Sequence, residues 1–497
     1  MVINVLKKAV IFVFVLIISI IIIDGPLNSL LTNTVALWLI LPISAVIGLI
    51  IWAKKLFDKY ENTLEKNFKL VFIIYLAVMF ILQLVPVGTL RFVPKWDLDA
   101  VFGGAISWIK NGDLHEYNDY FLWFPNNFGL LTIYNVIFSI GHFFFGEKTD
   151  YYMIATIMAC ISLTATRFSI VMICKKLLGT TSSYLAMLIM LFCPVMYFMS
   201  AAFYTDVLSM WATPLAILLF IKAYENHDKI KKPLLYIASA VAATFGAEIK
   251  FTVIIIVIAL AISLLIRGEF KELCIFGAAH LVIFTIVFTS FNALYNANFD
   301  NKIAEERNTP ILHWIMMGAS ENGSYNGEDY KFTRSFIDTD ERDRAIKDEL
   351  IKRYKNYGID GTMNLWKAKT LKDFGDGTLG ISDFLDDNVV KHSSLHEFLL
   401  YNGKHYNKWN TICTEYLLVM LIFMLLSVKK LLMDKKISSI QECIMLALYM
   451  CISGLWIFLM FWEASARYFS NFYGLILLGS VLGISIVIPK KESTTNE

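Results

Sequence analysis

Long uninterrupted runs of apolar residues recur along almost the whole of this 497-residue chain. The first covers roughly residues 9–23. Later runs reach about 17–25 residues, the length that crosses a hydrocarbon core of about 30 Å. Only 17% of the residues are charged, against about 25% in a soluble domain. Because a backbone inside lipid must satisfy its own hydrogen bonds, such runs favour helices. The chain is therefore predicted to be an all-α, multi-pass membrane protein.

Lysine and arginine gather in some of the short segments between these runs, although the formal net charge is only +2. Such clusters mark the cytoplasmic side, and threading the chain between them predicts about twelve crossings of a cell membrane, with both termini cytoplasmic. The near-neutral charge gives no reason to expect nucleic acid as a partner, and the lipid bilayer is the expected one. The marking clusters lie at residues 54–69, 175–176, 229–232, 267–271, 429–436 and 490–491.

The runs and these clusters divide the chain into four parts. Residues 1–69 are predicted to form an N-terminal transmembrane hairpin and a cytoplasmic loop. Residues 70–296 form a transmembrane core with a first outer loop at about 90–150, and residues 297–410 form a large second outer loop. The last transmembrane helices and a short cytoplasmic tail occupy residues 411–497.

The two outer loops contain helices of their own. Residues 127–146 are apolar enough to cross the membrane, yet a crossing would place Lys175 and Lys176 outside. We interpret this segment as a re-entrant or juxtamembrane helix within the first outer loop, with a full crossing as the alternative. A charged helix is predicted over residues 338–357 of the second loop.

Two carboxylates, Asp97 and Asp99, follow Pro94 at the start of the first outer loop. Since Pro94 ends the preceding helix, both are expected to open the next one. A carboxylate at a membrane surface can act as a general base toward an acceptor hydroxyl, but the helix dipole alone also favours it there. Asp206 is a third candidate, because a carboxylate close to lipid is expensive and commonly functional. Its alternative is a helix cap in a short loop.

Two cations stand at the predicted outer face, where the positive-inside rule makes them unexpected. Lys250 could bind a phosphate as a point charge, or it could pair with Glu248 or snorkel. Arg467 suits bidentate binding of a phosphate, but Glu463 lies four residues before it and could pair with it on one helix face. We expect both cations to hold a phosphate group.

Other polar and aromatic residues of the outer face are candidate substrate contacts. No second histidine lies at ligand spacing from His313, so no metal site is inferred. No cofactor is required by the sequence, and a divalent metal remains an option. The candidate contacts are Tyr120, Asn126, Asn127, His313, Trp314, Glu463 and Tyr468.

A series of short motifs, taken in order, resembles the GT-C type of integral membrane glycosyltransferases. The likeness is closest to the protein-mannosyltransferase-like (glycosyltransferase family 39-like) members of Gram-positive bacteria. Each motif is short, but the ordered set extends over residues 90–470. The motifs are Trp96-Asp97, Tyr120-Phe-x-x-Phe-Pro-Asn-Asn127, Tyr204-Thr-Asp206, Gly246-x-x-x-Lys250-x-Thr252, His313-Trp-Ile-x-Met-Gly318, Lys372-x-x-x-Asp376-Gly-Thr378 and Glu463-x-x-x-Arg467-Tyr468.

This resemblance implies a polyprenyl-phosphate-linked sugar as donor and an inverting transfer to an acceptor hydroxyl on the extracytoplasmic face. The acceptor would be a cell-wall or surface polysaccharide, a teichoic acid or a protein. By position, Asp97 takes the role of the catalytic aspartate, with Asp99 as its rival. Lys250 and Arg467 take the positions that hold the donor phosphate. The hairpin at residues 9–53 departs from the family core, which has its catalytic loop after the first helix.

Two other classes of protein fit a chain of this kind. A transporter or flippase of lipid-linked saccharides puts its ionisable residues near the bilayer midplane, where Arg167 is the main one here. An O-antigen-type polymerase or ligase also uses outer loops and lipid-linked donors, generally with outer arginine and histidine residues. The crowding of acidic and aromatic motifs in the outer loops favours a glycosyltransferase.

Overall fold

The computed structural model describes residues 2–32, 40–86, 88–385, 389–433 and 437–489. Over these residues the chain is helical, and its one β-type contact is an isolated bridge between Phe92 and Val389. The helices of the first half are α1 (Val2–Ile22), α2 (Asn28–Thr32), α3 (Ile40–Lys59), α4 (Glu61–Leu84), α5 (Trp96–Asn111), α6 (Asn118–Trp123), α7 (Phe128–Phe145), α8 (Tyr151–Leu178), α9 (Thr180–Leu191), α10 (Thr205–Leu208), α11 (Ala212–Tyr224) and α12 (Lys231–Ile249). Those of the second half are α13 (Ile254–Arg267), α14 (Phe270–Asn298), α15 (Asn301–Arg307), α16 (Ile311–Gly318), α17 (Gly327–Arg334), α18 (Thr339–Phe374), α19 (Ile381–Leu385), α20 (His396–Leu399), α21 (Tyr406–Leu426), α22 (Val428–Met433), α23 (Ser439–Phe461) and α24 (Ser470–Val487).

Nine helical stretches within the described ranges are long and apolar enough to cross a membrane. Two shorter apolar helices, Thr180–Leu191 and Phe251–Arg267, accompany them. An all-α membrane protein with several spanning helices is thus confirmed, and the number of about twelve crossings stays a prediction. The nine stretches are Ile3–Thr32, Glu61–Leu84, Pro125–Lys148, Tyr151–Leu178, Thr205–Tyr224, Phe270–Asn298, Tyr406–Leu432, Ser439–Phe461 and Ala466–Val487.

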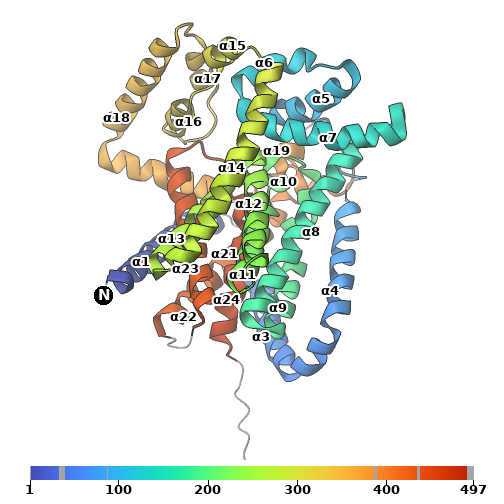
Figure 1. Cartoon of the computed structure of the whole chain (residues 1–497), viewed down its shortest axis with the longest axis vertical. Coiled ribbons are helices and arrows are strands. Elements are labelled where there is room, and N and C mark those ends of the chain that lie inside the picture. Colours follow the sequence, from blue (N-terminus) through green and yellow to red (C-terminus); the bar gives the residue numbers. More distant parts are fainter. Residues whose placement is uncertain (1, 33–39, 87, 386–388, 434–436, 490–497) are drawn as a thin grey trace, which may run out of the picture.

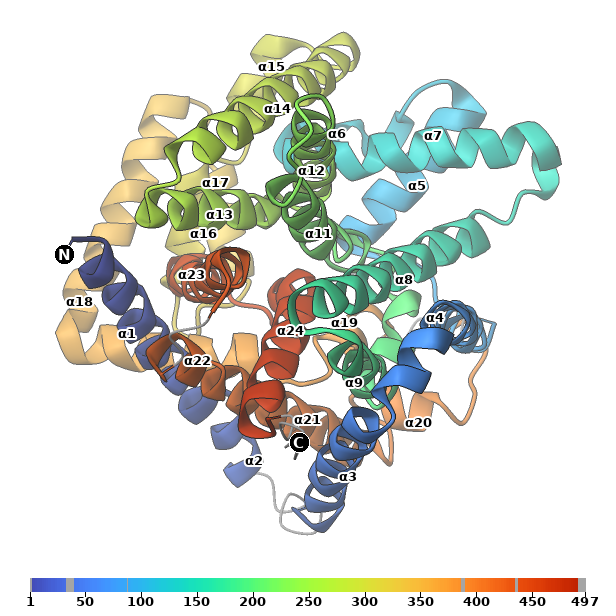
Figure 2. The same cartoon turned by 60° about the horizontal axis from the view of Figure 1, so that its bottom comes forward.

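Helix α24 stands at the centre of the bundle, with α8, α9, α21 and α23 around it (Figure 2). Its side chains are buried along almost its whole length. At the periphery, α4 and α14 leave large apolar side chains exposed, among them Ile73 and Leu281. In a membrane protein such faces meet lipid tails. The core therefore lies around α24, and α4 and α14 form part of the lipid-facing rim.

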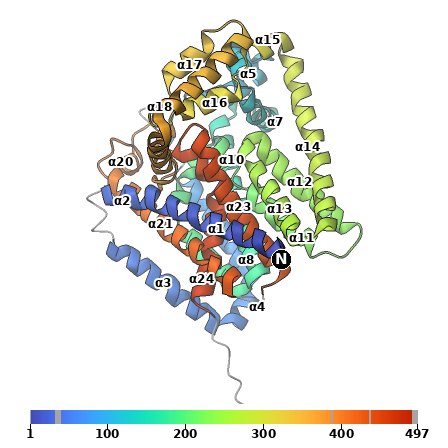
Figure 3. The same ribbon diagram turned by 90° about the vertical axis from the view of Figure 1, so that its left-hand side faces the viewer.

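The two segments that were predicted as outer loops fold into a helical cap at one end of the bundle, where α5, α7 and α15 to α18 gather (Figures 1 and 3). Helix α18 comprises two helical parts that meet at a kink at Gly358, so the first part ends at residue 357, as predicted, and the second continues to Phe374. It bends at Gly358, whose φ of +58° is strained for any other residue. The cap thus brings the far end of α18 back onto the bundle.

Helix α7 lies crosswise to α4 and oblique to α8 at the cap end of the bundle (Figure 1). It corresponds to residues 127–146, for which a juxtamembrane helix and a full crossing were both open. A helix that crosses the membrane with its neighbours runs roughly alongside them. The crosswise arrangement therefore favours the juxtamembrane interpretation.

The basic segments meet at the opposite end of the bundle. Lys7 donates to Glu442 over 2.7 Å, and Arg267 contacts the same carboxylate. Lys175 pairs with Glu65 at 3.0 Å. Further ion pairs at this end join Lys176 to Glu225 and Lys232 to Glu272. The described residues of these basic clusters thus share one end of the molecule, away from the cap, and residues 434–436 and 490–491 lie outside the described ranges.

The first predicted boundary, between residues 69 and 70, does not coincide with the end of a helix. It falls inside α4, which runs unbroken over Glu61–Leu84. The charged residues that were assigned to a loop simply extend the apolar helix, because neither proline nor glycine interrupts them. Before α3, Gly25 and Pro26 kink the first apolar run in a π-helical turn, Ile23–Leu27.

Candidate functional site

The site is assembled where the cap meets the bundle, from chain segments that lie far apart in the sequence. The first turn of α5 contributes Asp97, and the end of α12 contributes Lys250. Between α9 and α10 the chain is unwound except for two short 3-10 turns and leads to Tyr204, and the first turn of α10 contributes Asp206. A short 3-10 turn before α24, Ala466–Phe469, contributes Arg467.

The unwound segment before α10 is tolerated because side chains satisfy its backbone. The Tyr134 hydroxyl donates to the carbonyl of Phe203, and Arg167 donates to the carbonyl of Met196 over 3.3 Å. Non-helical backbone at membrane depth occurs where protein groups can supply such hydrogen bonds. Arg167, the one deep ionisable residue noted in the sequence, therefore has a structural task here.

Asp97 is held by hydrogen bonds from the first outer loop. Its Oδ1 accepts from the Tyr120 hydroxyl over 2.8 Å, and that hydroxyl accepts from Asn127 over 2.5 Å. The Tyr204 hydroxyl in turn donates to Asn127 over 3.3 Å. Burial and the nearby Asp97 raise the pKa of Tyr120 well above its usual value, so Tyr120 stays a proton donor. The chain of contacts fixes the orientation of one carboxylate.

Asp97 is not a helix cap. Lys95 occupies the N-cap position of α5, and the cap lacks a side-chain hydrogen bond. The side chain of Asp97 remains 40% exposed, so a substrate can reach it, and its Oδ2 lies 4.0 Å from an Arg467 nitrogen. The structure therefore pairs the exposed carboxylate loosely with a cation.

Asp99 faces different surroundings from Asp97. Its Oδ1 and the Tyr117 hydroxyl lie over the backbone of Gly103, one turn along α5. Burial and the neighbouring Glu116 raise the pKa of Asp99, against the effect of a hydrogen bond from Tyr117. Only Asp97 of the two carboxylates is joined to the Tyr120–Asn127 network.

Asp206 and Lys250 form a buried ion pair at the base of the site. The carboxylate is 2% exposed and the lysine side chain 13% exposed. Lys250 Nζ also lies 4.4 Å from the centre of the Tyr468 ring. Lys250 is thus neither paired with Glu248 nor extended into solvent. Its partner Asp206 is 44 positions away, and no sequence pattern links the two residues. Asp206 is the counter-ion of Lys250 rather than a free carboxylate.

Arg467 is surrounded by aromatic rings. Its guanidinium carbon lies 5.5 Å from the centre of the Tyr204 ring, 5.8 Å from Phe384 and 5.4 Å from Tyr468. Such rings stabilise a cation while leaving its N–H groups available to an anion. Arg467 and Lys250 both approach Tyr468, so two cations share one face of the site.

Glu463 does not pair with Arg467, which the four-residue spacing had left open. The chain from Trp462 to Ser465 is not helical, so the two residues do not share a helix face. Instead Glu463 is buried and accepts from the Tyr468 hydroxyl over 3.1 Å. Burial raises its pKa, against the effect of Arg467.

The second outer loop fixes this non-helical segment, residues 462–465, which we call the strap. Lys369 of α18 is fully buried and donates to the carbonyls of Gly318 and Trp462 over 2.8 and 2.5 Å. Asp373, one turn further on, accepts from the backbone N–H of Ser465 over 2.8 Å. Burial lowers the pKa of Lys369 and raises that of Asp373, each opposed by the other's charge.

Several of these site residues are not predicted by any pattern in the sequence. Lys369 and Asp373 are spaced four apart on one face of α18, but that spacing is common on exposed helices. No sequence motif includes Phe384, whose ring faces Arg467. Tyr204 was noted only as part of a motif, although its ring faces Arg467 and its hydroxyl extends the Asp97 network.

The remaining candidate contacts divide between the site and the cap. Trp314 stacks on Trp462 of the strap with ring centres 6.1 Å apart. Asn126 is exposed beside Asn127, at 3.5 Å. His313 is 1% exposed and lies 2.6 Å from the Thr333 hydroxyl inside the cap. Burial lowers its pKa to about 4. The structure therefore does not bring His313 to the site.

Among the described residues, three or more His, Cys, Asp or Glu side chains never come together as a metal site would need. Lys250 and Arg467 are the two cations that approach Tyr468. One partly exposed carboxylate, two cations and a group of tyrosines thus face one another at the junction of cap and bundle.

Comparison with curated proteins finds no match for the chain. A family model described as "conserved hypothetical integral membrane protein" matches residues 2–487, which include every element of the site. The chain therefore belongs to this family of integral membrane proteins.

Proposed function

We propose that the protein is a membrane glycosyltransferase that transfers a sugar from a polyprenyl-phosphate donor to an acceptor hydroxyl. The strongest support is that the partly exposed carboxylate of Asp97 lies 4.0 Å from an Arg467 nitrogen. Lys250 and Arg467 both approach Tyr468 on the same face of the site. A general base next to two phosphate-binding cations is the set of groups that such a transfer needs. The ordered motifs described above agree with this function.

In the proposed reaction, Asp97 accepts the proton of the acceptor hydroxyl as its oxygen attacks the anomeric carbon of the donor sugar. The new C–O bond forms on the face opposite the phosphate, the bond from the anomeric carbon to the phosphate oxygen breaks, and the configuration inverts. The departing polyprenyl phosphate keeps the electron pair. Arg467 and Lys250 stabilise its charge, and Tyr120 keeps Asp97 oriented toward the hydroxyl.

Asp206 has a supporting role in this proposal. Its buried contact with Lys250 holds the ammonium group near Tyr468 and prevents it from extending into solvent. Asp99 lies outside the Tyr120–Asn127 network, so we assign the base role to Asp97. The acceptor is a cell-wall or surface polysaccharide, a teichoic acid or a protein.

We infer that the site faces the extracytoplasmic side of the cell membrane. The basic segments gather at the other end of the bundle, and positive charge favours the cytoplasmic side. About twelve crossings with both termini cytoplasmic would agree with this orientation. A transporter of lipid-linked saccharides is less well supported, since Arg167 is engaged with the carbonyl of Met196.

A cell-based experiment tests this function. A strain that lacks the gene is complemented with the wild type, Asp97→Asn or Asp99→Asn, and its surface glycans are analysed for sugar composition by mass spectrometry. We expect the deletion to lose one sugar modification, which the wild type and Asp99→Asn restore and Asp97→Asn does not. Membrane levels of each variant are measured by immunoblot. Restoration by Asp97→Asn would rule out the proposed base.

A further inference from the structure

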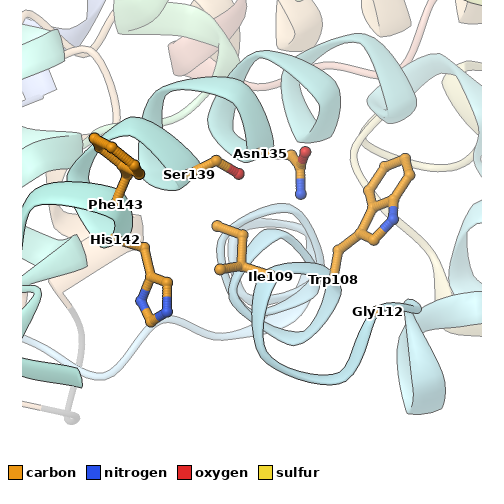
Figure 4. Close-up of a pocket in the computed structure, with 7 residues that line it drawn as sticks. All are labelled: Trp108, Ile109, Gly112, Asn135, Ser139, His142 and Phe143. Carbon is orange, nitrogen blue, oxygen red and sulfur yellow. The ribbon is translucent and has the colours of Figure 1, made fainter. Parts of the chain in front are cut away.

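An open groove lies between the C-terminal end of α5 and the crosswise helix α7 (Figure 4). Its cavity volume is about 460 Å³, enough for a small polar ligand. It lies on the same cap helix as Asp97 but at the other end of that helix. The residues that line it are Trp108, Ile109, Gly112, Asn135, Ser139, His142 and Phe143.

One wall of the groove is a polar stripe within an otherwise apolar helix. Asn135, Ser139 and His142 follow one another at helical spacing along α7 (Figure 4). Neither the Asn135 amide nor the Ser139 hydroxyl has a hydrogen-bond partner in the described part of the chain. The His142 Nδ1 lies 2.9 Å from the Tyr151 hydroxyl, which leaves its second ring nitrogen to the groove. Three polar side chains are therefore available to a ligand.

The opposite wall presents an aromatic ring and an open backbone. Trp108 projects from α5 into the groove (Figure 4). Gly112 ends α5 at a φ of +82°, a conformation that favours glycine, and the space where a side chain would stand is empty. A flat ring opposite amide and hydroxyl groups fits a ligand with both apolar C–H and hydroxyl surfaces.

The groove is also uncharged. None of its lining residues is a lysine, arginine, aspartate or glutamate. The nearest cation along α5, Lys110, lies 3.6 Å from a Glu147 oxygen and is paired with it. A phosphate headgroup would lack a counter-charge here, which argues for a neutral ligand over an anionic lipid.

We propose that this groove binds an uncharged carbohydrate, as a distal subsite for the acceptor glycan. The assignment of this carbohydrate as the acceptor glycan rests on the proposed function. Trp108 follows Asp97 by eleven residues on one helix, a separation of about 16 Å at roughly 1.5 Å per residue. A sugar held at Trp108 would therefore belong to a chain of several residues whose other end reaches Asp97.

Binding is tested with the purified full-length protein in lipid nanodiscs and a panel of neutral oligosaccharides of glucose, mannose and N-acetylglucosamine. Dissociation constants are measured by native mass spectrometry for the wild type, Trp108→Ala and the double variant Asn135→Ala/Ser139→Ala. We expect at least one oligosaccharide to bind the wild type and both variants to bind it about tenfold more weakly, a loss of about 1.4 kcal/mol. Phe144→Ala, an exposed residue outside the groove lining, is the matched control and should bind normally.

The outcomes separate this inference from the proposed function. Asp97→Asn should bind the oligosaccharide like the wild type while losing transfer. Glycan binding without any donor consumption by the wild type would overturn the function and retain the subsite. The subsite is overturned if none of the oligosaccharides binds the wild type, or if the groove variants bind the oligosaccharides as tightly as the wild type does. It is also overturned if the groove substitutions weaken only the binding of phosphatidylglycerol.

Discussion

Replacing Lys369 with methionine should release the strap from the cap. Methionine fills a similar volume but donates no hydrogen bond, so the buried carbonyls of Gly318 and Trp462 both lose a partner. Each unsatisfied buried group costs about 1–3 kcal/mol, or about 2–6 kcal/mol for the two together. The variant also leaves the buried Asp373 without its neighbouring cation. We expect a clearly lower unfolding temperature in nanodiscs than for the wild type at the same scan rate.

The matched control is Lys367→Met, which removes an exposed lysine from the same helix. It should change the unfolding temperature little, because an exposed lysine makes no comparable contact. Adding Asp373→Asn to Lys369→Met should restore part of the loss, since it removes the uncompensated buried carboxylate. If Lys369→Met unfolds at the same temperature as Lys367→Met, Lys369 does not hold the strap and the reasoning fails.

Three further predictions concern the strap, the cap and the Asp97 network. A Cβ on Gly318 would lie 2.5 Å from the Trp462 carbonyl oxygen, so Gly318→Ala should displace the strap and accelerate its cleavage in limited proteolysis; unchanged cleavage would contradict this. Because the pKa of His313 falls from 6.5 to about 4 on folding, stability should decline as the pH drops through that interval, by at most about 3 kcal/mol. His313→Gln should flatten this decline in thermal unfolding, and an equal slope in both proteins would refute it. Tyr120→Phe removes the hydrogen bond to Asp97 and should lower kcat about tenfold with little change in the donor KM; a KM effect alone would assign Tyr120 to donor binding.

Local patterns in the sequence predicted the membrane helices and the start of the cap. Apolar runs of spanning length must become helices in lipid, and Pro94 sets the helix start that places Asp97 in the first turn of α5. The charge pattern also predicted that Lys250 and Arg467 lie away from the basic segments. These features depend on the nearest few residues.

Contacts between distant segments could not be predicted in this way. The Asp206–Lys250 pair joins two helices, and the direction of the Asp97 side chain depends on Tyr120 and Asn127. Both depend on how the cap packs on the bundle, which no local spacing specifies. The second helical part of α18, from Gly358 to Phe374, was not predicted, because Gly358 is typical of a helix end and does end the first part there.

The most direct test measures transfer by the purified protein. Wild type, Asp97→Asn and Asp99→Asn are each incubated in liposomes with polyprenyl-phosphate sugars and a surface-glycan acceptor. The initial rate of polyprenyl phosphate release is then recorded. Since a general base contributes about 10²–10⁴ in rate, Asp97→Asn should be slower than the wild type by about a hundredfold or more, whereas Asp99→Asn should remain within several-fold. An Asp97→Asn variant that releases polyprenyl phosphate at the wild-type rate would contradict the central claim.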